Sequence, residues 1–234
     1  MNVLAISCHP DDMEIECAGT LLKCKARGDN VTVCHVANGN MGHFSIMPEE
    51  LGKMRIQEAQ DSAKIAGFKV ITLNIGDLRV YENSLEQMNS VVRVIREAQP
   101  DFIITHSPKD YMVDHRAVSK LVFDASFVAS VPHYEPELGP AAKTTPIYYM
   151  ETSGSFQFDP TEFVDVTDFI DTKISMLMCH KSQYVWLMEH DNLNVEEETR
   201  IKAGFRGLQC GVKYAEAFEQ EFTGHKVLPM RLLP

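Results

Sequence analysis

The sequence contains little basic charge, few cysteines and no long apolar run. It has 22 basic against 33 acidic residues and a net charge of −11. This balance argues against a nucleic-acid partner, because binding to a phosphate backbone depends on clustered lysine and arginine. The apolar runs are much shorter than the roughly 20 residues needed to cross a bilayer. We therefore expect neither a nucleic-acid partner nor a membrane partner.

The six cysteines, at positions 8, 17, 24, 34, 179 and 210, include no Cys-x-x-Cys pair. A chain of 234 residues does not need disulfides to fold, so we expect buried, reduced thiols. The first apolar run, residues 3–6, lacks the preceding basic segment of a secretion signal, which predicts a cytoplasmic protein. The length suits a single α/β domain over residues 1–234.

Apolar strand patterns alternate with amphipathic helix patterns through the first half of the chain. Strands are predicted at residues 3–6, 30–36, 70–73 and 102–105, and helices at 18–22, 48–67, 84–98 and after 115. This alternation predicts a doubly wound, mainly parallel α/β sheet with helices on both faces. In the common strand order 3-2-1-4-5, the first and fourth strands are neighbours, and ligands bind outside their carboxyl ends.

The second half of the chain is less regular. We predict strands at 147–150 and 163–166, a helix capped by Thr167 that runs to about residue 180, and a helix at 195–208. The stretch 183–194 has little periodicity, and we expect it to shape the pocket rim together with the loops 38–48 and 130–145. In the helix at 84–98, a stripe of apolar residues is expected in the core: Leu85, Met88, Val91, Val92 and Ile95.

The segment 8–14, Cys-His-Pro-Asp-Asp-Met-Glu, follows the first predicted strand and precedes a helix. Packing an imidazole and two carboxylates at the end of a buried strand is costly unless a cation offsets their charge. A catalytic zinc ion has three protein ligands and one open position. Because Asp114-His115 follows the neighbouring fourth strand, we predict that His9, Asp12 and His115 bind zinc or another divalent transition metal.

Asp11 lies next to a predicted ligand and is the candidate general base for hydrolysis of an amide. We also count Asp114 among the candidate catalytic residues. Simpler roles remain open, because Asp11, Asp12 or Asp114 could each cap the helix that follows it. Cys8 could also bind metal, but alternation along a strand is expected to turn its side chain away from that of His9.

Motifs occur along nearly the whole chain: residues 9–14, Arg55 with Glu58, residues 114–116, and the stretches 165–168, 180–183 and 214–218. These motifs resemble those of the LmbE-like (PIG-L) zinc N-deacetylase family. The resemblance implies a Rossmann-like fold, a homo-oligomer, and removal of an N-acetyl group from a small N-acetylglucosamine conjugate. It assigns His9, Asp12 and His115 to the metal and Asp11 to the general base. The tail resembles that of the bacillithiol-pathway deacetylases, which act on glucosaminyl-malate.

Two further positions follow from this resemblance. Arg55 matches a substrate-contacting arginine, although an ion pair with Glu58 would explain it equally well. Met112 stands where the family often has a histidine that assists the oxyanion or the leaving group. Either Tyr111 or His180 takes over that role, or the substrate differs, or activity is low.

Two other classes of function compete with the hydrolase. The departure at Met112 also allows a metal-retaining protein that binds a sugar conjugate and catalyses poorly. A dinucleotide-binding oxidoreductase would suit the predicted sheet, but the first strand is not followed by Gly-x-Gly-x-x-Gly.

Overall fold

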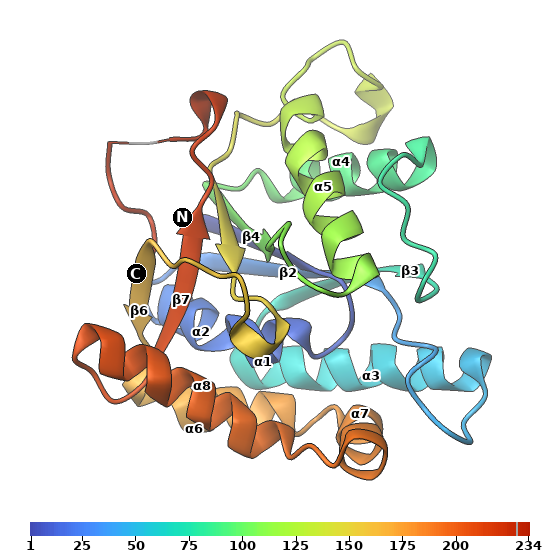
Figure 1. Cartoon of the computed structure of the whole chain (residues 1–234). Coiled ribbons are helices and arrows are strands. Elements are labelled where there is room, and N and C mark those ends of the chain that lie inside the picture. The colour runs from blue at the N-terminus through green and yellow to red at the C-terminus, as the bar shows by residue number, and fades with distance from the viewer. Residues whose placement is uncertain (228) are drawn as a thin grey trace.

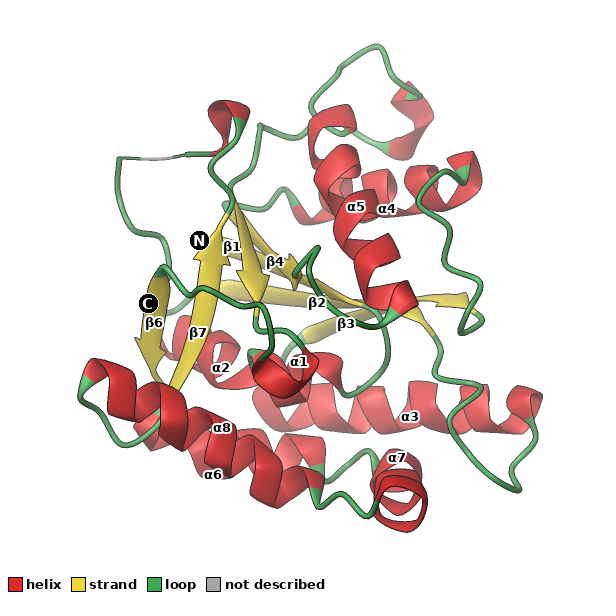
Figure 2. Ribbon diagram, viewed as in Figure 1, coloured by secondary structure: helices red, strands yellow, loops and turns green. Residues whose placement is uncertain are grey.

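The computed structural model describes residues 1–227 and 229–234, and its centre is one sheet of seven strands. Figures 1 and 2 show this sheet with helices on both of its faces. The strand order β3-β2-β1-β4-β5-β7-β6 confirms the predicted doubly wound, mainly parallel α/β fold. Strands β1 to β5 pair in parallel, and β7 is antiparallel to β5 and β6. The strands are β1 Asn2–Ser7, β2 Asn30–Ala37, β3 Lys69–Ile75, β4 Phe102–His106, β5 Ile147–Met150, β6 Glu162–Asp165 and β7 Ala215–Gln220.

The helices bury apolar side chains against both faces of the sheet. Along β1, Val3 and Ala5 lie in one apolar layer, whereas Leu4 and Ile6 lie in the other. This follows from strand geometry, which turns successive side chains to opposite faces. In the described part of the chain, no helix has the length and apolar character that a bilayer span requires. The helices are α1 Asp12–Glu16, α2 Ala18–Ala26, α3 Pro48–Ala66, α4 Leu85–Ala98, α5 Val113–Val128, α6 Ile170–Leu177, α7 Lys181–Trp186 and α8 Val195–Cys210.

Two predictions about helix ends were wrong. Leu85 is 66 % exposed, because it is the first residue of α4, directly after the N-cap Ser84, whose side chain accepts the N–H of Gln87. Thr167 does not cap α6. It lies in a short 3-10 turn, Thr167–Phe169, and its hydroxyl contacts the backbone of Tyr214 instead.

The carboxyl-terminal third is more regular than predicted. The segment 183–194 contains the end of α7 and a π-helix, Leu187–Asp191, where we expected irregular chain. The tail motif 214–218 forms most of β7, which lies between β5 and β6. Its alanines and glutamates have low strand propensity, so neighbouring strands rather than local preference determine this conformation.

Candidate metal centre and active site

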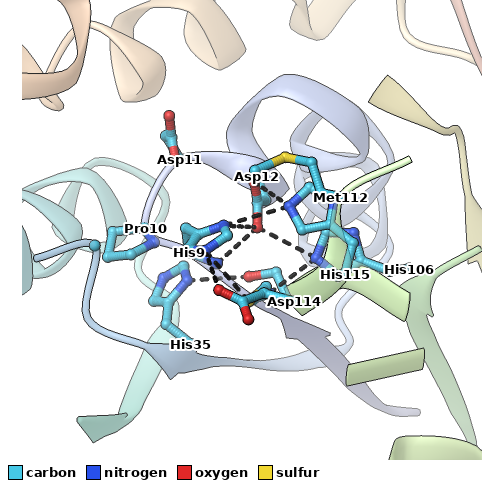
Figure 3. Close-up of polar contacts among 12 residues, drawn as sticks. His9, Pro10, Asp11, Asp12, His35, His106, Met112, Asp114 and His115 are labelled. Atoms are coloured by element: carbon cyan, nitrogen blue, oxygen red, sulfur yellow. Dashed lines mark hydrogen bonds and ion pairs between the residues drawn. The ribbon is translucent and has the colours of Figure 1, made fainter. Parts of the chain in front are cut away.

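His9, Asp12 and His115 lie together at the carboxyl ends of β1 and β4 (Figure 3). Nδ1 of His9 is 3.3 Å from Nε2 of His115 and 3.5 Å from Oδ2 of Asp12, and His115 Nε2 is 3.3 Å from Asp12 Oδ1. Two donors bound to one tetrahedral zinc at about 2.0–2.1 Å are about 3.3–3.4 Å apart. Both the donor types and their spacing therefore fit zinc or a similar divalent metal.

Asp114 contacts Nε2 of His9, the ring nitrogen opposite the one that faces Asp12 and His115. Its Oδ2 is 3.3 Å from Nε2 of His9 and accepts the N–H of Leu78 at 2.7 Å. The side chain does not cap α5, so that prediction was wrong: the carboxylate contacts His9 and Leu78, which follow β1 and β3. A carboxylate in this position fixes the tautomer and orientation of a metal-binding histidine.

Asp110 has the same relation to His115, and the sequence did not reveal it. Its Oδ2 is 3.3 Å from Nδ1 of His115, and the carboxylate accepts the N–H groups of Met112 and Ser153. Burial raises the pKa of Asp110, but His115 and these N–H groups outweigh burial and lower the pKa to about 2. An aspartate five residues before the predicted ligand His115 was the only local signal.

The carboxylates of the candidate metal centre favour the protonated, positively charged forms of His9 and His115. Burial lowers the pKa of His115, but the carboxylates of Asp12 and Asp110 outweigh burial and raise the pKa to about 9. Burial also lowers the pKa of His9, but Cys8, Asp12 and Asp114 together raise it well above 6.5. Buried carboxylates that favour charged imidazoles are the electrostatic pattern that a bound cation would satisfy.

Asp11 precedes Asp12 in the chain, and Arg55 holds its carboxylate. Its φ of 106° is unusual for a residue other than glycine, and its side chain makes no helix-capping bond. Nη2 of Arg55 donates to Oδ1 of Asp11 at 2.9 Å and to the carbonyl oxygen of Pro10. Burial raises the pKa of Asp11 to about 6 although Arg55 lowers it. Arg55 does not pair with Glu58, which accepts the backbone and hydroxyl groups of Ser182 instead.

The turn after β1 excludes one of the alternatives left open and contradicts one expectation. Asp12 does not cap α1, because its Oδ2 accepts the backbone N–H of His9 at 2.6 Å. Cys8 Sγ lies 3.6 Å from His9 Nε2, so the two side chains do not point to opposite faces. Strand alternation does not apply here because β1 ends at Ser7.

His106, at the end of β4, was also missed as a site residue. Its ring stacks on that of His115 with centroids 3.9 Å apart, and its Nε2 accepts the N–H of Cys8 at 2.8 Å. Burial and the neighbouring His115 lower the pKa of His106 to about 4. The neutral ring therefore supports the turn after β1 through its bond to the N–H of Cys8.

The residues expected to replace the missing histidine lie in different environments. Figure 3 shows Met112 beside Asp12 and His115. Tyr111 is 74 % exposed, whereas His180 is 1 % exposed, with its Nε2 3.2 Å from Oε1 of Glu14. Burial lowers the pKa of His180, but Glu14 outweighs burial and raises it.

Several known proteins are similar to this chain in sequence and in fold. The family model for GlcNAc-PI de-N-acetylase, PIG-L, matches residues 4–126. Diacetylchitobiose deacetylase of Thermococcus kodakarensis is 29% identical over 92% of this chain and 81% of that protein. The 4-oxalmesaconate hydratase of Pseudomonas putida is 26% identical over 94% of this chain and 89% of that protein.

Among solved structures, N,N'-diacetylchitobiose deacetylase from Pyrococcus horikoshii matches with a TM-score of 0.81 and 26% identity. The match covers 94% of this chain and 83% of that one. Together with the family model, which matches more than half of the chain, this similarity extends from the first strand into the carboxyl-terminal third. The chain belongs to the PIG-L (LmbE-like) family.

Proposed function

We propose that this protein is a metal-dependent hydrolase that removes the N-acetyl group from a small N-acetylglucosamine conjugate. The observation that supports this most directly is the convergence of His9, Asp12 and His115. Deacetylases among the similar proteins support an N-acetylglucosamine conjugate as the substrate. They include diacetylchitobiose deacetylase and, at 24% identity, the 1D-myo-inositol 2-acetamido-2-deoxy-alpha-D-glucopyranoside deacetylase of Corynebacterium diphtheriae.

In this proposal His9, Asp12 and His115 hold the metal, and Asp114 and Asp110 keep the two imidazoles in place. When bound, a divalent metal would lower the pKa of a water molecule and polarise the acetyl carbonyl group. Asp11 accepts a proton from the attacking water and later donates it to the leaving amine nitrogen. Arg55 positions Asp11 for both transfers through its bond to Oδ1.

The oxyanion needs a donor that Met112 does not have. Tyr111 precedes Met112 on the same loop, and its exposed side chain has space to turn toward a bound substrate. We assign it this role rather than His180, which is buried against Glu14. Loss of one oxyanion donor costs about a hundredfold or more in rate. Tyr111→Phe should therefore lower kcat to about this extent without changing the metal content.

The central experiment combines metal analysis with a screen for acetate release. The screen uses zinc-loaded protein with N-acetylglucosamine, N,N'-diacetylchitobiose and N-acetylglucosaminyl-malate. Asp11→Asn should lower acetate release by roughly 10²- to 10⁴-fold while metal is retained. His9→Ala and His115→Ala should lose the metal itself. Acetate release that survives Asp11→Asn, or metal retained in both histidine variants, would contradict the mechanism.

The second candidate is a metal-retaining binding protein for the same sugar conjugates. It is favoured by Met112, which removes a donor that the family often has. In that case the protein would bind a sugar conjugate and zinc but release no acetate. Because one relative is a hydratase, 4-oxalmesaconate is included in the screen to detect addition of water instead.

A further inference from the structure

Three aromatic side chains form a cluster on the surface beside the candidate active site. Phe44 comes from the loop before α3, Trp186 ends α7, and His190 lies in the π-helix that follows. The rings of Phe44 and Trp186 are 4.6 Å apart between centroids, and those of Trp186 and His190 are stacked at 4.2 Å. We call these three residues the aromatic platform.

Gly42 connects the platform to the residue that holds the general base. A Cβ atom at Gly42 would lie 3.9 Å from Cδ1 of Trp186 and 3.5 Å from Nη1 of Arg55. Trp186 and Arg55 therefore both border this glycine. The other terminal nitrogen of Arg55 donates to Asp11. A ligand that reaches Asp11 past Arg55 would have the platform next to it.

Hydrogen bonds attach the loop that contains Phe44, and the helix that contains Trp186, to the elements around the site. Asp77 accepts the N–H groups of Gly39 and Met41, and its Oδ1 is 4.0 Å from Nε2 of His9. This holds the loop that contains Phe44.

The helix that contains Trp186 is attached in a similar way. The N–H and hydroxyl groups of Ser182 donate to Glu58 at 2.9 and 2.6 Å, which fastens α7 to α3. The π-helix at Leu187–Asp191 then places His190 over Trp186. Short π-helices occur frequently at functional sites.

The exposure of the platform indicates a ligand with an apolar face. Phe44 is 54 % exposed, although it contacts Trp186. Leaving apolar surface in water is unfavourable, and a ligand that covers it removes this cost. A pyranose ring has an apolar C–H face that suits an aromatic ring, together with polar hydroxyl edges.

Charge around the platform disfavours an anionic ligand. His190 Nδ1 lies 2.7 Å from the carboxylate of Asp191, and Glu189 precedes it on the same exposed turn. The whole chain has a net charge of −11. An anionic group such as a carboxylate or phosphate would be repelled by these neighbours.

We propose that the aromatic platform is a binding subsite for a second, uncharged pyranose ring linked to the N-acetylglucosamine that is deacetylated. This inference rests on the proposed function and narrows its substrate class to N-acetylated oligosaccharides. Phe44 and Trp186 are the residues that determine specificity for the added ring.

Binding is tested without catalysis. Trp186 is the only tryptophan in the chain, so its fluorescence reports directly on the platform. N,N'-diacetylchitobiose and N-acetylglucosamine are titrated into the zinc-loaded Asp11→Asn protein, and dissociation constants are measured by calorimetry. We expect the disaccharide to change Trp186 emission and to bind about tenfold more tightly, a difference of about 1.4 kcal/mol. Equal affinities, or no change in emission, would overturn the proposal.

Variants of Phe44 and Trp186 test whether these side chains cause the tighter binding of the disaccharide. In the same background Phe44→Ala should weaken disaccharide binding about tenfold and leave monosaccharide binding unchanged. The matched control is Phe127→Ala, since Phe127 is 63 % exposed on α5 and is not part of the platform. With the catalytically intact protein, Trp186→Ala should raise KM for the disaccharide about tenfold at unchanged kcat, and Trp186→Phe should restore most of the loss. An equal effect of Phe44→Ala on both sugars would overturn the proposal.

The outcomes separate this inference from the proposed function. If neither sugar releases acetate but the disaccharide still binds with a change in Trp186 emission, the subsite stands and the hydrolase fails. If both sugars are deacetylated equally and Phe44→Ala does not change their ratio, the hydrolase stands and the subsite fails. Tighter binding of N-acetylglucosaminyl-malate than of the disaccharide also overturns the subsite, because that ligand is anionic.

Discussion

Each candidate ligand histidine has one nitrogen facing the other donors and the opposite nitrogen facing an aspartate. Nδ1 of His9 and Nε2 of His115 face each other, with Asp114 and Asp110 behind them. An imidazole can donate its lone pair to a metal from only one nitrogen while the other carries the proton. We therefore expect the two aspartates to orient the candidate ligand histidines.

Asp110→Asn tests this arrangement at His115. The substitution keeps the size of the side chain but removes the charge that stabilises the Nδ1–H tautomer. We expect zinc affinity to fall about 10- to 100-fold, as is usual for the partner of a ligating histidine. Competition with a zinc chelator measures the change. Asp124→Asn on α5, which removes an exposed pair with Lys120, is the control, and an unchanged affinity in Asp110→Asn would show that Asp110 is not needed.

The loop between β2 and α3 lies against Arg55, the residue that holds Asp11. Gly39 in this loop has a φ of +74°, and a Cβ atom there would lie 2.4 Å from Nε of Arg55. The absence of a side chain at this position lets the guanidinium reach both Asp11 and the carbonyl oxygen of Gly39. The conformation of this loop therefore determines the position of the Arg55 guanidinium. Neither helix propensity nor the apolar pattern of the sequence predicts that position.

Gly39→Ala should displace Arg55 and release Asp11. We expect a loss of roughly 1–3 kcal/mol in the free energy of unfolding from backbone strain, and a lower kcat at unchanged metal content. Urea unfolding and steady-state kinetics measure the two effects. Gly67→Ala is matched for strain, with φ +65° and its nearest neighbour 3.8 Å away at Lys25, and should cost stability only. Equal kcat losses in both variants would contradict the role assigned to Gly39.

The turn between α2 and β2 is fastened by Asp29. Its carboxylate accepts from the amino-terminal ammonium group at 2.8 Å and from Arg27 at 2.6 Å. Burial raises the pKa of Asp29, but these two cations outweigh burial and lower the pKa below 3.8. A lowered carboxyl pKa contributes stability above the unfolded-state value, and this stability is lost as pH falls through the folded-state value.

Asp29→Asn should therefore lower the free energy of unfolding at pH 7 by about 1–2 kcal/mol. The difference from the unsubstituted protein should shrink as pH falls below about 4. Urea midpoints between pH 2 and pH 7 measure this dependence. Asp61→Asn removes an exposed pair with Lys64 and should leave the midpoint unchanged. A deficit that persists undiminished at pH 2 would rule out the charge as its cause.

At the scale of the whole molecule, the carboxyl-terminal third fastens the amino-terminal helices. Glu216 on β7 accepts the N–H groups of Gly19 and Thr20 at the start of α2 and pairs with Lys173 of α6. His9 and His115 come from segments 106 residues apart and meet only when β1 and β4 are paired. Metal binding should therefore stabilise the complete fold rather than one local segment.

Zinc at a hundred times its dissociation constant should add about 2.7 kcal/mol to the free energy of unfolding. For a chain of this size, that corresponds to an increase in Tm of roughly 5–10 °C. Calorimetry with zinc and with a chelator measures the difference. His115→Ala should show the same Tm in both conditions. A zinc-dependent shift that persists in His115→Ala would place the metal elsewhere.

The placement of the candidate ligands followed from two kinds of local information. Apolar runs predicted the strands, and the rule for parallel sheets placed the turn after β1 beside the segment after β4. His9, Asp12 and His115 lie together because that topology brings the carboxyl ends of β1 and β4 to one edge. Their roles as ligands, and the role of Asp11 as base, stay predictions until metal and activity are measured.

The sequence by itself determined the parallel order of the first five strands and the chemistry available at their carboxyl ends, because periodicity and spacing are local properties of the chain. Only the tertiary structure decided that Asp110 and Asp114 hold the histidines, that Arg55 pairs with Asp11 rather than with Glu58, and that the tail becomes β7. Each of these contacts depends on loop conformation and on partners far away in the chain, and no local pattern encodes either.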